Sequence, residues 1–164
     1  VVPDILCLGK ALTGGTLGMA ATVATGEVFE SFSSHASENA LMHGPTYGAN
    51  PLACAAAHAS LDLFAQYPRL TQAQAIEKSL TELLEPCRSL PGVVDVRTCG
   101  AIGVVQVERL HSQDKLCERF VEAGIWLRPF HDIFYLTPPL SITPEQLQKL
   151  AAATVEVIAD WSRS

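Results

Sequence analysis

The sequence predicts an α/β protein in two parts: the end of a larger α/β domain over residues 1–66, and a small α+β domain over residues 71–164. Two short apolar strands, a glycine-rich loop and a long Ala-rich helix are typical of the first kind of domain. Beyond Pro68 the pattern changes to amphipathic helices that alternate with pairs of short strands, as in a sheet with helices on one face. A hydrophobic content of 48% and a charged content of 17% favour a buried core over disorder.

In the first part, the apolar run over residues 5–8 predicts a strand, and TGGTLG at residues 13–18 predicts a loop. The β-branched stretch 19–25 predicts a second strand, and residues 26–32 a short helical turn. Residues 33–47 are polar and rich in turn formers, which predicts a loop of the length that is often functional.

A helix follows this loop. Asn50 is a suitable N-cap and Pro51 a suitable first residue. The body, LACAAAHASLDLF, is apolar on almost every side, so we expect it to be buried between layers, with His58 in the core.

The second part opens with a helix over residues 71–90, where Thr71 and Gln74 have the spacing of a capping box. Its other expected elements are strands at 93–97, 101–108, 125–127 and 133–136 and helices at 112–123 and from 143 onward. Gly124 is expected to end the helix before it, and Thr143-Pro144-Glu145-Gln146 to begin the last one with a capping box.

Composition excludes several function classes. The net charge is −6 with no basic run, so the sequence does not predict nucleic-acid binding. No apolar stretch approaches the roughly 20 residues of a membrane span. The five cysteines are odd in number and lack CxxC spacing, which favours free thiols in a reducing, cytoplasmic setting. Because the chain opens inside an expected core strand, we expect it to be the C-terminal piece of a longer protein.

Lys10 is the first candidate for chemistry. It follows an apolar strand and faces a glycine loop, whereas Lys78, Lys115 and Lys149 lie on the polar faces of expected helices. Ligands of α/β domains bind beyond the carboxyl ends of strands. Desolvation favours the neutral form of a partly buried lysine, which can then form a Schiff base with a carbonyl. The alternative is a solvated lysine at a strand end.

Two further stretches carry candidates for binding. In MHGPTYGANPLACAAA, residues 42–57, Thr46 could donate to a phosphate or could simply be a turn residue. In GIWLRPFHDIFYLTPP, residues 124–139, Arg128 suits a bidentate contact with a carboxylate, and Tyr135 could present its hydroxyl to the same pocket. The alternatives are an internal salt bridge for Arg128 and core packing for Tyr135. The five histidines lack metal-ligand spacing, so we predict no metal site.

Taken together, PDILCLGKALTGG, MHGPTYGANPLACAAA and WLRPF with FYLTPP resemble the class III aminotransferases, which have fold type I and use pyridoxal 5'-phosphate. The resemblance runs in one order from about residue 3 to about residue 158. It implies that the chain is the C-terminal portion of such an enzyme. Within the family, the HGPT and WLRPF segments resemble the members that act in biotin biosynthesis.

The resemblance also implies residue roles. Lys10 matches the lysine that holds the cofactor and then moves a proton between substrate and cofactor. Pro45 and Thr46 match the pair that reaches the cofactor phosphate of the neighbouring subunit, which gives the loop 33–47 a reason to be long. The substrate-contacting positions are matched by Gly44, Arg128 and Tyr135.

The implied reaction transfers an amino group from S-adenosylmethionine to 8-amino-7-oxononanoate and gives 7,8-diaminononanoate, in a homodimer with active sites at the interface. The family's aspartate partner of the pyridinium nitrogen and its Gly-Ser phosphate cradle lie upstream of this sequence, and Asp4 is not that aspartate. We therefore expect no appreciable transaminase activity from the 164 residues alone.

Two alternatives stay open. The parent could be another class III aminotransferase, acting on ornithine, acetylornithine or 4-aminobutyrate, and its amino donor would separate these possibilities. The chain could instead be a non-catalytic module that self-associates, since residues 71–164 have enough elements for a core of their own, whereas residues 1–66 do not.

Overall fold

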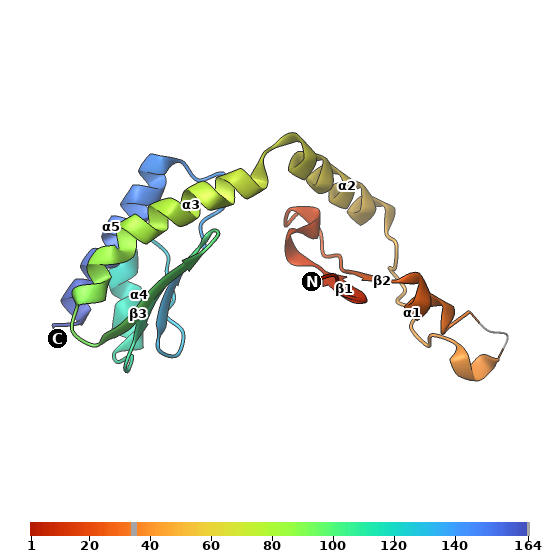
Figure 1. Ribbon diagram of the computed structural model, residues 1–164, viewed down its shortest axis with the longest axis horizontal. Coiled ribbons are helices and arrows are strands. Elements are labelled where there is room, and N and C mark those ends of the chain that lie inside the picture. Colours follow the sequence, from red (N-terminus) through yellow and green to blue (C-terminus); the bar gives the residue numbers. More distant parts are fainter. Residues whose placement is uncertain (34–35, 164) are drawn as a thin grey trace. The chain divides into compact units, whose positions relative to one another are not determined.

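The computed structural model describes residues 1–33 and 36–163, which form two compact units, Val1–Tyr67 and Pro68–Ser164 (Figure 1). Each unit has its own small antiparallel sheet, of two strands in the first and three in the second. No described helix has both the length and the apolar composition that crossing a membrane requires.

The described part of unit 1 contains two short strands, two α-helices and two 3-10 turns. In chain order these are β1 (Ile5–Leu8), the 3-10 turn η1 (Lys10–Thr13), β2 (Ala21–Ala24), α1 (Gly26–Glu30), the 3-10 turn η2 (Ser37–Asn39) and α2 (Pro51–Gln66). β1 and β2 pair antiparallel, with Ile5 opposite Ala24 and Leu8 opposite Ala21. The strands, the short helix and the long loop lie where the sequence predicts them, apart from residues 34 and 35 of the loop, which lie outside the described residues.

The start of α2 follows the prediction, but its burial does not. The Asn50 side chain accepts hydrogen bonds from the N–H groups of Leu52 and Ala53 at 3.0 and 3.3 Å. Along the helix, however, only Ala53 and Ala57 are buried, and His58 is exposed. Burial between layers and a core position for His58 were therefore wrong. Among the described residues of unit 1, η1 is the main element that packs against α2.

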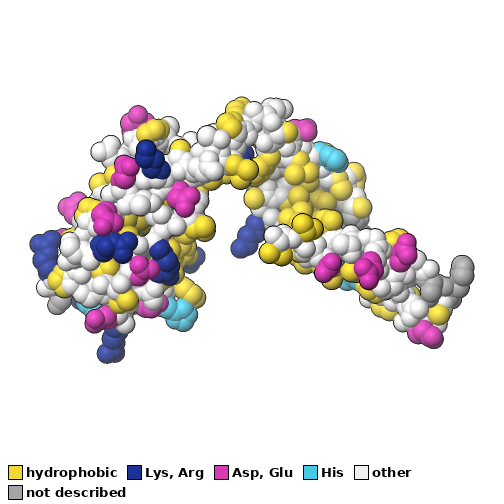
Figure 2. All heavy atoms as spheres, viewed as in Figure 1, with side chains coloured by type: hydrophobic (Ala, Val, Ile, Leu, Met, Phe, Trp, Pro, Cys, Tyr) yellow, Lys and Arg dark blue, Asp and Glu magenta, His cyan; other side chains and the backbone are white. Residues whose placement is uncertain are grey.

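Much apolar surface of unit 1 is consequently uncovered. Both faces of the two-stranded sheet are open, because β1 has no buried residue and β2 has one that is partly buried. Figure 2 shows hydrophobic side chains gathered on the surface around these strands. A sheet of two strands with a single long helix buries too little area to hide these apolar side chains.

Unit 2 is an α+β unit with three strands in the order β3-β4-β5. Its elements are α3 (Arg69–Leu84), the 3-10 turn η3 (Glu85–Ser89), β3 (Val93–Cys99), β4 (Ile102–Val107), α4 (Gln113–Glu122), β5 (Ile133–Leu136) and α5 (Pro144–Trp161). β4 is the central strand, with Val96 opposite Val105 on one side and Phe134 opposite Val105 on the other.

Helix ends in unit 2 show one correct and one incorrect capping prediction. At α5 the Thr143 side chain accepts from the Gln146 N–H at 3.2 Å, and the Gln146 side chain accepts from the Thr143 N–H at 3.0 Å. The capping box there is confirmed. The box predicted at Thr71 and Gln74 was wrong, because α3 begins at Arg69 after Pro68 and Thr71 already lies inside the helix.

The strand predicted at residues 125–127 was also wrong. Gly124, at a φ of 76°, does end the preceding helix as expected. The N–H of Ile125 then bonds to the carbonyl of Phe120 at 3.0 Å, so it closes the end of α4 instead of joining a ladder. Buried and exposed side chains do alternate in this segment, as in a strand, since Leu127 is buried and Trp126 is exposed.

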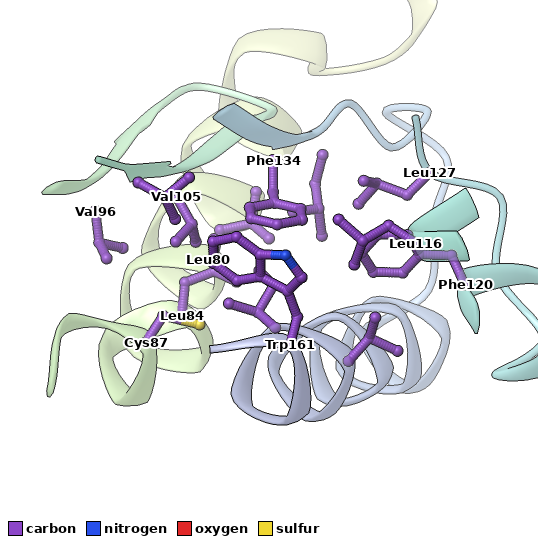
Figure 3. Packing of buried hydrophobic residues seen from close by; sticks show 14 of the residues in the cluster. Leu80, Leu84, Cys87, Val96, Val105, Leu116, Phe120, Leu127, Phe134 and Trp161 are labelled. Carbon is purple, nitrogen blue, oxygen red and sulfur yellow. The ribbon is translucent and has the colours of Figure 1, made fainter. Parts of the chain in front are cut away.

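The core of unit 2 lies between one face of the sheet and the helices α3, α4 and α5 (Figure 3). Phe134 of β5 packs edge-on against Phe120 of α4 and Trp161 of α5, with ring centroids 6.1 and 5.4 Å apart. α3 approaches the sheet so closely at Gly103 that an added Cβ would stand 2.7 Å from the Leu84 side chain. A larger residue at this position would therefore force the fully buried Leu84 side chain to move.

Cys87 belongs to this core, and the burial of its thiol can be tested by the pH dependence of stability. All five cysteines are free, and burial raises the pKa of the Cys87 thiol from 9.0 to about 11. Because the pKa is higher in the folded state, the neutral thiol contributes stability below about pH 9, and that contribution is lost as the pH rises through 11.

We expect the free energy of unfolding of unit 2 to fall more steeply between pH 9 and 10.5 in the wild-type chain than in Cys87→Ala, by at most ~1.4 kcal/mol per pH unit. Urea titrations followed by tryptophan fluorescence report this unit, since Trp126 and Trp161 both lie in it. Cys99→Ala, at an exposed thiol, is the control. Parallel pH profiles for wild type and Cys87→Ala would contradict the assignment.

Candidate active site

Lys10 is the first residue of η1, and Gly9 separates it from the end of β1. Gly9 is extended, with a φ of −166°, and Lys10 then adopts a φ of 48°, in the left-handed region that few residues other than glycine occupy. A lysine held in this conformation costs of order 1 kcal/mol or more, and such strain concentrates at functional sites. Its side chain is exposed and makes no ion pair with any described residue.

The glycine loop after Lys10 is closed by its own hydroxyls. The buried Thr13 donates to the carbonyl of Leu17, and Thr16 donates to the carbonyl of Thr13 at 2.8 Å. From α2, Ser60 donates to the carbonyl of Ala11 at 3.1 Å. These bonds fix the backbone that carries Lys10, although the loop contains Gly14 and Gly15.

Thr46 lies in a turn beside a hollow of about 500 Å³. The turn is closed by a bond from the Gly48 N–H to the Pro45 carbonyl at 3.0 Å. Among the described residues, the Thr46 hydroxyl has no hydrogen-bond partner, so it is available to a ligand. The hollow is lined by Gly18, Met19, Ala20, His43, Pro45, Thr46, Tyr47, Gly48, Ala49, Asn50 and Ala53.

Two predicted residues of unit 1 lie outside this lining. Gly44 stands between two lining residues but is not itself one of them, and Lys10 is not one either. Gly9, the residue before Lys10, does lie near the hollow. A Cβ added to Gly9 would stand 3.9 Å from the carbonyl oxygen of Met19, which is a lining residue. The structure therefore brings Pro45 and Thr46 together and leaves Lys10 on an adjoining part of the unit.

In unit 2, Arg128 and Tyr135 line one hollow of about 320 Å³, so the structure brings these two predicted residues together. Arg128 follows the buried Leu127 and precedes the buried Pro129, whose carbonyl accepts from the Gln113 side chain at 2.8 Å. Tyr135 lies on the outward face of β5, opposite Val104 of β4.

The exposure of Lys10 and Arg128 decides between the alternatives left open by the sequence. Lys10 is exposed, which agrees with a solvated lysine at a strand end and not with a partly buried one, and Arg128 is exposed as well. The internal salt bridge considered for Arg128 is not formed with any described residue, nor is Tyr135 packed in the core. Flanking buried residues fix the backbone of an element, but the alternating side chains between them face outward.

The Arg128 hollow contains two residues that were not predicted from the sequence, Trp126 and Thr137. The alternation of buried and exposed residues could have found both, since each lies two positions from a predicted residue. Trp126 precedes Arg128 by two, and Thr137 follows Tyr135 by two.

The side chains of unit 1 fit a phosphate-bearing aldehyde such as pyridoxal phosphate. An exposed lysine amine can bond to a carbonyl carbon, and the free Thr46 hydroxyl can donate to a phosphate oxygen. In unit 2, the Arg128 guanidinium lies in a hollow with no acidic side chain in its lining, which suits an anionic ligand.

Comparison with known proteins identifies the family of the chain. Residues 1–158 match the family described as aminotransferase class-III. An adenosylmethionine-8-amino-7-oxononanoate aminotransferase of Corynebacterium glutamicum is 44% identical over 151 residues, or 92% of this chain and 36% of that protein. The chain thus spans about a third of the length of this curated relative.

Solved structures give the same fold. The adenosylmethionine-8-amino-7-oxononanoate aminotransferase of Methanocaldococcus jannaschii aligns with a TM-score of 0.86 and 34% identity over 97% of this chain and 39% of its own. The ornithine delta-aminotransferase of Plasmodium falciparum also aligns with a TM-score of 0.86, at 30% identity over 100% of this chain and 41% of its own. On the family match over residues 1–158, this chain belongs to the class III aminotransferases and has part of their fold.

Proposed function

We propose that this chain supplies the cofactor-binding lysine and the carboxylate-binding arginine of a pyridoxal-phosphate aminotransferase of biotin biosynthesis. The reaction would transfer an amino group from S-adenosylmethionine to 8-amino-7-oxononanoate and give 7,8-diaminononanoate. The observation that carries this proposal is the 44% identity with a relative of that name over 92% of the chain.

In this proposal, each candidate residue has a role in binding the cofactor or the substrate. Lys10 Nζ holds the cofactor covalently and later takes and returns the proton at the substrate carbon that bears the amino group. Pyridoxal phosphate, when bound, supplies the electron sink for the bonds to that carbon. The Thr46 hydroxyl and the Pro45 turn bind the phosphate, Arg128 binds the substrate carboxylate in a bidentate contact, and Gly44 and Tyr135 contact the substrate.

The proposed assembly is a homodimer in the cytoplasm, in which Pro45 and Thr46 of one subunit serve the lysine of the other. Lys10 does not line the Thr46 hollow of its own chain, which supports this division between subunits. In this proposal, residues 1–66 are the end of the cofactor-binding domain and residues 71–164 form the small C-terminal domain.

The amino donor separates this proposal from an ornithine, acetylornithine or 4-aminobutyrate enzyme. The chain should replace the matching segment of the C. glutamicum relative and yield an enzyme that uses S-adenosylmethionine and restores growth without biotin to a strain lacking this aminotransferase. The same exchange into the P. falciparum ornithine delta-aminotransferase should give an inactive protein. Activity only in the second graft, with ornithine as donor, would overturn the proposed substrate.

A non-catalytic, self-associating module is the competing function from another class. Unit 2 has a core of its own, which is the observation that favours it. Grafts that fold and dimerise but remain inactive in both hosts would support the module and contradict the enzyme.

A further inference from the structure

The hollow around Arg128 contains more binding groups than the predicted arginine and tyrosine. Along β5 and its continuation, Phe134 and Leu136 are buried and the residues between and after them, Tyr135 and Thr137, are exposed. The period of two along a strand places Tyr135 and Thr137 on one face, and both line the hollow. Thr137 therefore lines the same space as Arg128 and Tyr135.

The polar groups of the hollow have no partners within the described chain. Arg128 forms no ion pair or hydrogen bond there, and neither hydroxyl, of Tyr135 or Thr137, forms a hydrogen bond. No acidic side chain lines the hollow. A guanidinium and two hydroxyls without an internal partner are donors suited to one anionic group, since a carboxylate accepts about four hydrogen bonds.

The rest of the lining is apolar. Trp126 is 76% exposed, which is unusual for a tryptophan, and it lies on the same side of its segment as Arg128. Pro138, Pro139 and Leu150 complete the wall, and the two prolines offer no N–H group. At about 320 Å³ the hollow is at the small end of ligand sites, so it suits one carboxylate with an alkyl chain.

We propose that Thr137 and Trp126 are additional substrate-contacting residues, and that this hollow in unit 2 binds an aliphatic carboxylate by itself. Arg128 holds the carboxylate in a bidentate contact, Thr137 donates a further hydrogen bond to it, and the Trp126 indole covers the alkyl chain. The proposal rests on the proposed function, in which Arg128 binds the substrate carboxylate.

Octanoate is a suitable probe, and Trp126 reports its binding. Acrylamide quenches exposed tryptophan, so it should reach Trp126 and not Trp161, which is 4% exposed. The difference between the wild-type chain and Trp126→Phe isolates the signal of Trp126. We expect octanoate to protect Trp126 from acrylamide in a saturable way. Acetate, without the chain, and octylammonium, with the opposite charge, should not protect it.

Variants then separate the contributions. Thr137→Val keeps the shape and removes the hydroxyl, so we expect the octanoate midpoint to rise roughly 10- to 150-fold, as for one lost hydrogen bond to a charged group. Thr137→Ser should restore the wild-type midpoint. Thr71→Val, at an exposed threonine of α3 outside the hollow, should leave it unchanged. Arg128→Gln should abolish protection.

The outcomes distinguish this inference from the proposed function. A midpoint unchanged in Thr137→Val but lost in Arg128→Gln would overturn the role of Thr137 and leave that of Arg128. Protection that persists in Arg128→Gln would overturn the carboxylate-binding role of Arg128, on which the proposed function depends. Absence of saturable protection in the wild-type chain would overturn binding by unit 2 alone.

Discussion

Replacing Phe134 by alanine should destabilise unit 2 by about 3–5 kcal/mol, a large fraction of the stability of a small domain. Phe134 is fully buried at the centre of the core, between Phe120 of α4 and Trp161 of α5. The substitution deletes a large apolar side chain and leaves a cavity. The residues around this cavity belong to helices and to the sheet, so they cannot move far enough to fill it.

Urea unfolding followed by tryptophan fluorescence measures this loss, because Trp161 packs against Phe134. Tyr135→Ala is the matched control, since it deletes a similar side chain from the outward face of the same strand. We expect it to cost less than half as much. If both substitutions lowered the free energy of unfolding equally, the assignment of the core to one face of the sheet would be wrong.

Lys10→Ala should remove transaminase activity from the graft into the C. glutamicum relative. Proton transfer by a positioned side chain contributes about 10²- to 10⁴-fold in rate, and the covalent attachment of the cofactor is lost as well. The matched control is Lys78→Ala, at an exposed lysine of α3. A small primary amine added to the Lys10→Ala enzyme should partly restore the rate, which no structural role of the lysine would predict.

Strain at Lys10 gives a second control. Lys10→Gly removes the same amine but tolerates the φ of 48°. The Lys10→Gly enzyme should therefore be at least as stable as the wild type and as inactive as Lys10→Ala. Activity retained in either variant would contradict the role of Lys10. Borohydride reduction in the presence of pyridoxal phosphate should label Lys10 in the active graft, in preference to Lys78, Lys115 and Lys149. Equal labelling of all four lysines would show no selective site.

Part of this protein could be predicted from sequence because it depends on local physics. The capping box at Thr143 and the stop at Gly124 each require only a few neighbouring residues, and both are present. The short strand predicted at residues 133–136 is also present, as β5 (Ile133–Leu136). The family could also be identified from short segments, since LGKALTGG and HGPT preserve their order in the chain.

Other features depended on contacts that no local pattern contains. The helix α2 is apolar on most sides, which predicted burial, yet burial requires a layer on each side, and among the described residues of unit 1 the main element packed against α2 is η1. The segment 125–127 alternates like a strand, but a strand exists only where a neighbour accepts its hydrogen bonds, and Ile125 is already bonded to Phe120.

The sequence by itself determined the chemistry of the candidate groups: an amine at Lys10, a hydroxyl at Thr46 and a guanidinium at Arg128. Only the tertiary structure decided which of them share a space. Pairing of β4 with β5 and the turn at His131-Asp132, between the bridged Phe130 and Ile133, set four residues of two segments around one hollow: Trp126, Arg128, Tyr135 and Thr137. Chemical type is a property of each residue, whereas proximity follows from the packing of the whole unit.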